Sequence, residues 1–279
     1  MIVLSAYTLR PALDARRAGL SSLVLTPDLG LTRGEASLDP AGVHFPGDES
    51  LDWESVENVC ASEGGCFLVK GGAAEKIQAF SAETGRVYSL YPTQAAPTML
   101  LSGLPMHRIK GVDPHQDTLK KVKTIRPLVG RVLDTATGLG YTAIEAARTA
   151  GQVTTIELDP AVLTIARRNP WSQELFDNPR ITQIIDDSFE QVTQFADNTF
   201  SRILHDPPMF SLAGDLYSGE FYAQLYRILK NTGRLFHYIG DLESSSGRRV
   251  MRGVALRLQE AGFRNITQRK DAFGLVAFK

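Results

Sequence analysis

The sequence has few cysteines, no long apolar segment and no excess of charge of either sign. Its two cysteines, Cys60 and Cys66, are too few for a disulfide framework and form no C-x-x-C pair of the kind that binds zinc. No apolar run reaches the roughly 20 residues that cross a bilayer, and at the start the apolar residues precede the charges, unlike in a secretory signal. A formal net charge of -1 excludes the overall basic character of proteins that coat nucleic acid. We therefore expect a cytoplasmic protein with reduced thiols, no metal site and no membrane association.

The chain is long enough for one large domain or two modest ones, since it has 279 residues of which 43% are hydrophobic. Residues 1–112 are rich in Gly and Pro and in short alternating runs, which predicts β-hairpins with little helix. The clearest hairpin joins 77–80 to 87–91 through a turn at Gly85. We interpret this region as a small β-rich domain that helps to select the substrate.

Residues 113–279 follow a different pattern, in which strands and helices alternate as they do in a parallel sheet. A segment around 114–123 begins this region as a linking helix that carries Lys120, Lys121 and Lys123. Strands are predicted at 131–136, 152–158, 181–186, 201–206 and 233–239, and helices at 141–150, 160–168, 187–195, 219–230 and 246–261. The last residues, from Phe263 on, predict a closing antiparallel pair. The region is expected to be one α/β domain.

A glycine-rich turn between the first strand and helix of this domain carries the strongest functional signal. Asp134, Gly138 and Gly140 form a D-x-x-x-G-x-G pattern there. Glycine lets the backbone approach a ligand closely, and the start of the next helix presents unpaired N–H groups. An ordinary strand-to-helix turn, in which glycine only eases packing, explains the same residues.

A second signal is Glu157, at the end of the next strand. It lies about 20 residues after the turn, where a carboxylate can accept hydrogen bonds from both ribose hydroxyls of a nucleotide. This spacing suits a dinucleotide as well as S-adenosylmethionine. The turn has Ala143 in place of the third glycine of a dinucleotide fingerprint, and an acid, Asp134, stands where a cationic ligand would benefit from it. The two features together favour S-adenosylmethionine.

With these motifs in this order, the chain resembles the class I S-adenosylmethionine-dependent methyltransferases over roughly its last 160 residues. The resemblance implies a Rossmann-like α/β sheet with strand order 3-2-1-4-5-7-6, here preceded by the small β-rich N-terminal domain. It also implies which residues bind the cofactor: Asp134, Thr135, Gly138 and Gly140 near the methionine end, Glu157 at the ribose, and Asp186, Asp187 and Ser188 near the adenine. Asp187 is the preferred partner of the adenine amino group and Asp186 the alternative, while a helix N-cap explains the acid pair without any ligand.

The fourth predicted strand leads into the sequence HDPPMF, which we expect to face the transferred group. It resembles the Asp/Asn-Pro-Pro-aromatic motif of amino-methylating enzymes, except that Met209 stands at the aromatic position. The candidate catalytic residues are Asp206, to bind or deprotonate the nucleophile, His205, and Tyr217, to cover the substrate. For His205, a structural role on the opposite face of the strand is the competing interpretation.

Three functions remain open from the sequence. The whole layout, including LHDPP and LYSGEFY, is similar to that of a family of uncharacterised predicted methyltransferases, which favours methyl transfer to a small-molecule or RNA acceptor. The order of a β-domain and an α/β domain is also similar to that of the spermidine synthases, which are aminopropyltransferases. A non-catalytic nucleotide- or RNA-binding module is the third, because basic residues gather between 107 and 131, although a linking helix that exposes its lysines to water explains that run too. A homodimer would fit any of the three.

Overall fold

The computed structural model describes residues 1–279, which divide into two compact units. The first unit contains residues 1–115 and 161–173, and the second contains 116–160 and 174–279. The division predicted from the sequence, after Val112, assigns none of 161–173 to the N-terminal part. As a boundary between independently folding domains it stays a prediction.

The first unit is built mainly from three antiparallel sheets. One sheet has the order β1-β6-β7, from β1 (Ile2–Ser5), β6 (Cys66–Lys70) and β7 (Ala73–Lys76). The second contains β2 (Ser22–Leu25), β3 (Gly34–Leu38), β4 (Gly42–His44) and β5 (Ser50–Asp52), and the third contains β8 (Gln78–Ser81), β9 (Arg86–Tyr91), β10 (Thr98–Leu101) and β11 (Leu104–Pro105). These sheets confirm the β-rich N-terminal region, and β8 pairs with β9 as the predicted hairpin, with Gly85 at φ +64°.

Two helices in this unit show that the expectation of little helix was wrong. These are α1 (Ala6–Arg17) and α2 (Trp53–Ala61), and α1 in particular was not predicted. Pro11 lies inside α1, where proline removes a backbone donor and normally ends a helix. The helix persists because Leu9 and Ala12 are fully buried and α1 joins the core cluster of this unit.

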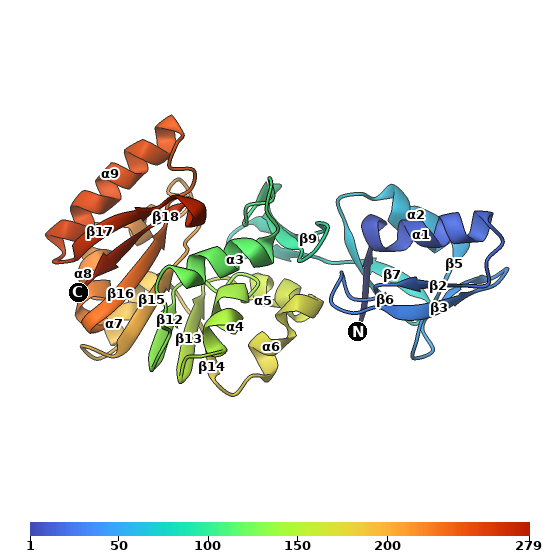
Figure 1. The fold of residues 1–279 in the computed structure, drawn as a ribbon, viewed down its shortest axis with the longest axis horizontal. Coiled ribbons are helices and arrows are strands. Elements are labelled where there is room, and N and C mark those ends of the chain that lie inside the picture. The colour runs from blue at the N-terminus through green and yellow to red at the C-terminus, as the bar shows by residue number, and fades with distance from the viewer. The chain divides into compact units, whose positions relative to one another are not determined.

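The second unit contains a seven-stranded sheet in the order β14-β13-β12-β15-β16-β18-β17 (Figure 1). The strands are β12 (Arg131–Asp134), β13 (Gln152–Glu157), β14 (Ile181–Ile185), β15 (Phe200–His205), β16 (Leu229–Tyr238), β17 (Arg264–Arg269) and β18 (Gly274–Phe278). Neighbours from β14 to β16 are parallel, while β18 pairs antiparallel with both β16 and β17. Numbered from β12, this order is the predicted 3-2-1-4-5-7-6, so the Rossmann-like methyltransferase sheet is confirmed.

The remaining elements are helical. They are α3 (Pro114–Lys123), α4 (Tyr141–Ala147), α5 (Pro160–Arg167), α6 (Gln173–Asp177), α7 (Ser188–Gln194), α8 (Gly219–Ile228) and α9 (Ser245–Glu260), with short 3₁₀ turns η1 (Pro170–Ser172), η2 (Gly214–Tyr217) and η3 (Lys270–Ala272). Figure 1 shows α9 beside β17 and β18, and α4 contacts β12, β13 and β14. The sequence did not predict η1 and α6. No helix is both long and apolar enough to span a membrane.

The apolar core of the second unit packs around the sheet and does not include the carboxyl ends of its parallel strands. Residues from α7, α8 and α9 pack with Leu133 of β12 and Ile203 of β15 in one cluster. Val132 and Leu133 are neighbours along β12 and are both fully buried, as expected for a parallel strand covered on both faces. Polar side chains gather instead where the parallel strands end.

Candidate active site

The candidate active site lies at the carboxyl ends of the parallel strands of the second unit. Asp134 ends β12 and Glu157 ends β13, while Asp206 directly follows β15. The strands are in register, since Asp134 pairs with Thr155 of β13 on one side and Leu204 of β15 on the other. Ligands in open parallel sheets bind outside this edge, so these side chains are placed where a cofactor and substrate would meet.

Asp134 is a fully buried carboxyl group that is only half satisfied. Its Oδ2 accepts hydrogen bonds of 3.0 Å from the hydroxyls of Thr142 and Thr155. Its Oδ1 is buried and has no hydrogen-bond partner. Burial raises the pKa of Asp134 to about 7, even though the two threonine hydroxyls and the nearby backbone N–H of Ala136 lower it. A ligand that brings a donor or a positive charge to Oδ1 would satisfy this group.

The glycine-rich turn has two glycines with different tasks. Gly138 has a φ of +52°, and a Cβ added there would meet nothing within 4 Å, so the backbone is open to an approaching group. Gly140 has a φ of +79°, and an added Cβ would lie 2.7 Å from Leu175. Gly140 is therefore required by packing as well as by conformation, and Gly138 is the position that leaves space for a ligand.

Glu157 faces the turn. Its Oε2 accepts a hydrogen bond of 2.9 Å from the N–H of Gly138, and its Oε1 accepts one of 3.1 Å from the N–H of Asp159. Burial raises the pKa of Glu157 to about 7, against the lowering effect of these backbone donors. The carboxylate is thus fixed beside the open glycine, and its role toward a ribose stays a prediction.

The side chains expected around the adenine and the methionine mostly form hydrogen bonds with backbone groups of neighbouring residues. The hydroxyl of Ser188 donates to the carbonyl of Thr135 at 2.6 Å, and the side chain of Thr135 bonds to Nδ1 of His205 at 2.7 Å. Asp187 is the N-cap of α7 and accepts from the N–H of Phe189 at 2.8 Å. Asp186 is exposed and accepts from the N–H of Asp187 at 2.8 Å. The cap expected for this acid pair is present, and the roles of these residues toward a cofactor stay predictions.

Asp206 is held by a lysine that the sequence analysis placed in water. The Nζ of Lys121 lies 2.7 Å from Oδ2 of Asp206 and 2.9 Å from Oδ2 of Asp117. The side chain of Lys121 is only 2% exposed, whereas Lys120 and Lys123 on the same helix are exposed. The expectation that this helix shows all its lysines to solvent was therefore wrong. Asp206 acts as half of an ion pair and keeps 17% of its side chain exposed.

His205 is buried and has both ring nitrogens occupied. Nδ1 bonds to the hydroxyl of Thr135 and Nε2 lies 2.9 Å from the carbonyl of Leu216. Burial lowers the pKa of His205 to about 3, so the ring is neutral. Its ring centroid lies 4.3 Å from that of His237, which is also buried. The geometry supports the structural interpretation of His205 and leaves no ring nitrogen for a substrate.

Tyr217 supports the loop after β15 from inside. It is 2% exposed, and its hydroxyl donates to the carbonyl of Pro208 at 3.0 Å. Phe210 packs edge-on against it with ring centroids 5.4 Å apart, and both Met209 and Phe210 are about half exposed. Tyr217 thus stabilises the Pro208 segment from inside the protein, whereas the sequence had suggested that it lies over the substrate.

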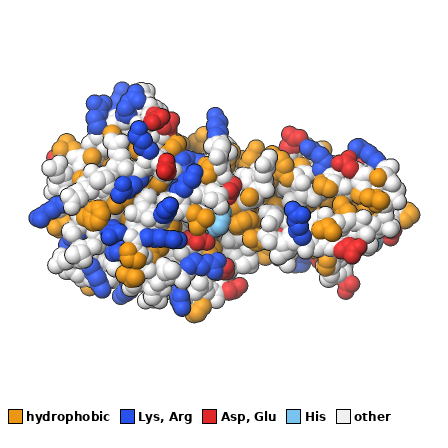
Figure 2. Space-filling model, viewed as in Figure 1, with side chains coloured by type: hydrophobic (Ala, Val, Ile, Leu, Met, Phe, Trp, Pro, Cys, Tyr) orange, Lys and Arg blue, Asp and Glu red, His pale blue; other side chains and the backbone are white.

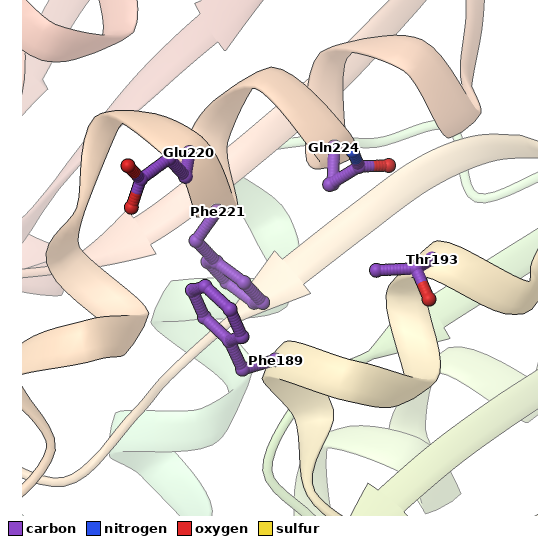
Figure 3. A pocket seen from close by; sticks show the side chains of 5 residues that line it. All are labelled: Phe189, Thr193, Glu220, Phe221 and Gln224. Carbon is purple, nitrogen blue, oxygen red and sulfur yellow. The ribbon is translucent and has the colours of Figure 1, made fainter.

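A groove of about 390 Å³ lies between α7 and α8 in the same unit (Figure 3). Phe189 and Phe221 stack in it with ring centroids 6.1 Å apart. Glu220, Thr193 and Gln224 complete its lining. Phe221 is 1% exposed and belongs to the core cluster of the unit.

Basic side chains gather on the surface of the second unit as well. Figure 2 shows them where Figure 1 draws α9, on which Arg248, Arg249 and Arg252 are exposed.

No group of three or more His, Cys, Asp or Glu side chains is arranged to hold a metal ion. An RNA or small-molecule partner stays a prediction.

Comparison with known proteins gives three findings. A model of the family described as conserved hypothetical protein 95 matches residues 103–232. The uncharacterized protein MJ1233 of Methanocaldococcus jannaschii is 43% identical over 238 residues, which are 84% of this chain and 80% of that protein. Polyamine aminopropyltransferase 2 of Streptomyces coelicolor is 28% identical over 160 residues, which are 53% of this chain and 28% of that protein.

The solved structure of spermidine synthase from Thermotoga maritima is similar in fold. It has a TM-score of 0.56 and 19% identity, and the match covers 72% of this chain and 70% of that one. At this identity the likeness concerns the fold alone. Together with the sheet order and the residues at its open edge, these findings show a transferase fold of the kind that methyltransferases and aminopropyltransferases share. The chain belongs to the family of MJ1233, and its second unit has the Rossmann-like sheet of the methyltransferase fold, with similarity in fold to the spermidine synthases.

Proposed function

We propose that the protein transfers a methyl group from S-adenosylmethionine to an amine acceptor. The observation that carries the proposal is the buried, unpartnered Oδ1 of Asp134 beside the open backbone of Gly138. A buried acceptor atom without a donor is costly, so its presence indicates that a ligand completes it. The ammonium group of the methionine moiety is a donor of the right charge.

The rest of the cofactor would bind along the same strand ends. Glu157 is fixed next to Gly138 and would accept hydrogen bonds from the ribose hydroxyls. Asp187 or Asp186 would receive the adenine amino group, since both follow β14, the neighbour of β13. When bound, S-adenosylmethionine supplies a methyl group on a positively charged sulfur, which a nucleophile can attack directly.

Asp206 would bind and orient the acceptor amine. Its carboxylate is paired with the ammonium of Lys121, which stabilises the charged form and makes Asp206 a hydrogen-bond acceptor more than a base that takes up a proton. Tyr217 fixes the carbonyl of Pro208, and the two adjacent prolines limit how the loop can move. The residues of the chain thus supply alignment of the acceptor, which is the main contribution a protein makes to a direct displacement.

Aminopropyl transfer is the second candidate, and the similarity to a polyamine aminopropyltransferase favours it. Such a reaction would use decarboxylated S-adenosylmethionine, which keeps the amine that Asp134 would bind but lacks the neighbouring carboxylate. The acidic side chains Asp134, Glu157 and Asp206 suit the greater positive charge of that compound. The choice between the two cofactors is therefore the first question for experiment.

Calorimetry with the purified protein shows which of the two cofactors binds. We expect S-adenosylmethionine and S-adenosylhomocysteine to bind, and to bind more tightly than decarboxylated S-adenosylmethionine and methylthioadenosine. Asp134→Ala and Glu157→Ala should each weaken binding by at least tenfold, because each removes a direct partner of the ligand. Tight binding of the decarboxylated pair alone would favour aminopropyl transfer, and unchanged affinity in both variants would refute the site.

Turnover is tested with labelled cofactor and candidate acceptors. The wild-type protein is incubated with S-adenosylmethionine labelled in the methyl group and, separately, with linear polyamines, a pool of small amines and total tRNA. We expect label in an amine-containing acceptor and none with Asp206→Ala, although this variant should still bind the cofactor. Label transferred equally well by Asp206→Ala would show that the acceptor binds elsewhere.

A further inference from the structure

Basic residues are concentrated in one short segment of the second unit. Residues 245–270 contain seven basic residues and one acid, and so carry a formal charge of +6. The whole chain carries -1, which leaves -7 for all other residues together. With the flanking acids Asp241, Glu243 and Asp271 included, residues 241–271 still carry +3. A charge asymmetry of this size indicates a partner of negative charge.

The fold exposes six of these seven basic side chains to solvent. They belong to neighbouring elements, since α9 contacts the edge strand β17 (Figure 1). The seventh, Arg257, is half-buried, and its Nε donates to the carbonyl of Tyr217 at 2.8 Å. The six exposed side chains are those of Arg248, Arg249 and Arg252 in α9, Arg264 and Arg269 in β17, and Lys270 in η3. We call this surface the α9–β17 face.

Most of the charge on the α9–β17 face is not neutralised within the protein. Lys270 forms an exposed ion pair of 3.4 Å with Glu243, whose carbonyl also accepts a hydrogen bond from Arg248. No ion pair is formed by the other four arginines, which are Arg249, Arg252, Arg264 and Arg269. Arg248 and Arg252 are four residues apart, a spacing at which like charges destabilise a helix. The arrangement therefore does not help α9 to fold, and bound anions would offset its repulsion.

The other exposed residues of the α9–β17 face indicate the kind of anion. Apart from Leu256 and Glu260, those of α9 and β17 carry hydroxyl or amide groups, which contact phosphate and sugar in nucleic acids: Ser245, Ser246, Gln259, Asn265, Thr267 and Gln268. A protein interface or a membrane-binding helix would present an apolar area, whereas Leu256 is the one large apolar side chain exposed here. The apolar side of α9, with Val254 and Leu258, is already buried in the core.

We propose that the α9–β17 face binds the phosphate backbone of a nucleic acid, which is a function beyond the proposed transfer reaction. Guanidinium groups suit this task, because each can donate two parallel hydrogen bonds to phosphate oxygens. Such contacts read no base sequence. Binding releases the cations that are condensed on the polyanion, so the affinity falls steeply as salt is added. RNA and DNA share this backbone chemistry.

Binding is measured with the full chain and three probes. Fluorescence anisotropy follows labelled single-stranded RNA and labelled duplex DNA, and co-sedimentation follows phosphatidylserine vesicles. The α9 variant combines Arg248→Gln, Arg249→Gln and Arg252→Gln. The β17 variant combines Arg264→Gln and Arg269→Gln and tests the second element separately. Because no cofactor is present, the result is independent of the proposed function.

The matched control removes as much charge from the first unit as the α9 variant removes from the second. It combines Arg33→Gln, Lys70→Gln and Lys76→Gln, all at exposed positions. We expect the control to keep the nucleic-acid affinity of the wild type within about threefold, because it weakens only a long-range attraction that salt screens. Circular dichroism should show that the control and both variants are folded as the wild type is.

The dependence of affinity on salt is the decisive measurement. Each phosphate contact contributes about 0.7 to the slope of the logarithm of affinity against the logarithm of salt concentration for single strands, and about 0.9 for duplex DNA. For single-stranded RNA we expect the α9 variant to reduce the magnitude of this slope by about 2 and the β17 variant by about 1.4. At about 0.1 M salt the α9 variant should bind at least tenfold more weakly than the wild type.

Loss of binding to either nucleic acid in the α9 variant, but not in the control, supports the proposal, and the tighter of the two probes identifies the source of the phosphates. Three results would overturn it. The wild type could fail to bind RNA and DNA at about 0.1 mM protein. The α9 variant could have the same affinity and salt slope as the matched control. The wild type could bind the vesicles and neither nucleic acid, which would identify an anionic lipid surface as the partner instead.

Discussion

The half-satisfied carboxyl of Asp134 leads to a prediction about stability. Its pKa is about 7 in the folded protein and 3.8 in the reference state. A carboxyl group whose pKa is raised by folding removes stability as the pH rises from the unfolded value to the folded one. At 1.36 kcal/mol per pKa unit, this loss grows by about 3 kcal/mol between pH 5 and pH 8.

Asp134→Asn removes the titrating group and keeps its shape. The amide oxygen can accept from Thr142 and Thr155 as Oδ2 does, while the amide nitrogen takes the position of Oδ1 and leaves an unpaired buried donor. That donor costs about 1–3 kcal/mol, but the cost is the same at both pH values. Relative to the wild type, the free energy of unfolding of the variant should therefore increase by about 3 kcal/mol between pH 5 and pH 8.

Urea unfolding followed by circular dichroism at both pH values measures this difference. Tryptophan fluorescence is unsuitable, because Trp53 and Trp171 both lie in the first unit. Asp177→Asn, at an exposed position, is the control and should show no such change. S-adenosylmethionine should stabilise the wild type and fail to stabilise Asp134→Asn. A stability difference between variant and wild type that is equal at pH 5 and pH 8 would refute the reasoning.

Three further predictions follow from individual contacts. The pKa of His205 falls on folding from 6.5 to about 3, so the contribution of this residue to stability is fully present above pH 6.5 and is lost as the pH falls. Between pH 6.5 and pH 5 the free energy of unfolding of the wild type should fall by about 2 kcal/mol more than that of His205→Gln. Equal losses in the two proteins, measured by urea unfolding, would contradict this. Gly140→Ala should lower the free energy of unfolding by about 1–3 kcal/mol, because the added methyl group strains the backbone and clashes with Leu175. Gly138→Ala should lower it by only about 1 kcal/mol. Relative to its loss of stability, Gly138→Ala should show the larger loss of cofactor affinity. Tyr217→Phe should keep cofactor affinity within about twofold and raise the KM for the acceptor, because the carbonyl of Pro208 loses its donor; an unchanged KM would show that the loop needs no such support.

Much of the second unit could be predicted because its signals are local. The glycines of the turn, the acid at the end of β13 and the alternation of strands and helices are each visible in a short stretch of sequence. Together they predicted Glu157 at a strand end, and they carried the resemblance that implied the sheet order. The approach of Glu157 to Gly138 then follows from the geometry of adjacent parallel strands.

What could not be predicted depends on tertiary packing. Unlike Lys120 and Lys123, Lys121 has an acid four residues before it, Asp117, but its burial also involves Asp206, which lies 85 residues later. Helix α1 was missed because Pro11 argues against a helix locally, whereas the packing of its buried face against α2, β1 and β2 is a matter of tertiary structure. The sequence analysis placed Tyr217 over the substrate, because nothing in the sequence shows that its hydroxyl donates a hydrogen bond to the carbonyl of Pro208.

The antiparallel strand β18 has a consequence for how the protein is made. In the chain it follows β17, but in the sheet it lies between β16 and β17 and bonds to both. The position beside β16 must therefore stay vacant while the ribosome is still adding the preceding segment, and β17 has no partner until 274–278 emerge. Closure of the sheet therefore waits until β18 has been made, and a nascent chain halted before this point would present an open, hydrogen-bonding edge to chaperones or to other chains.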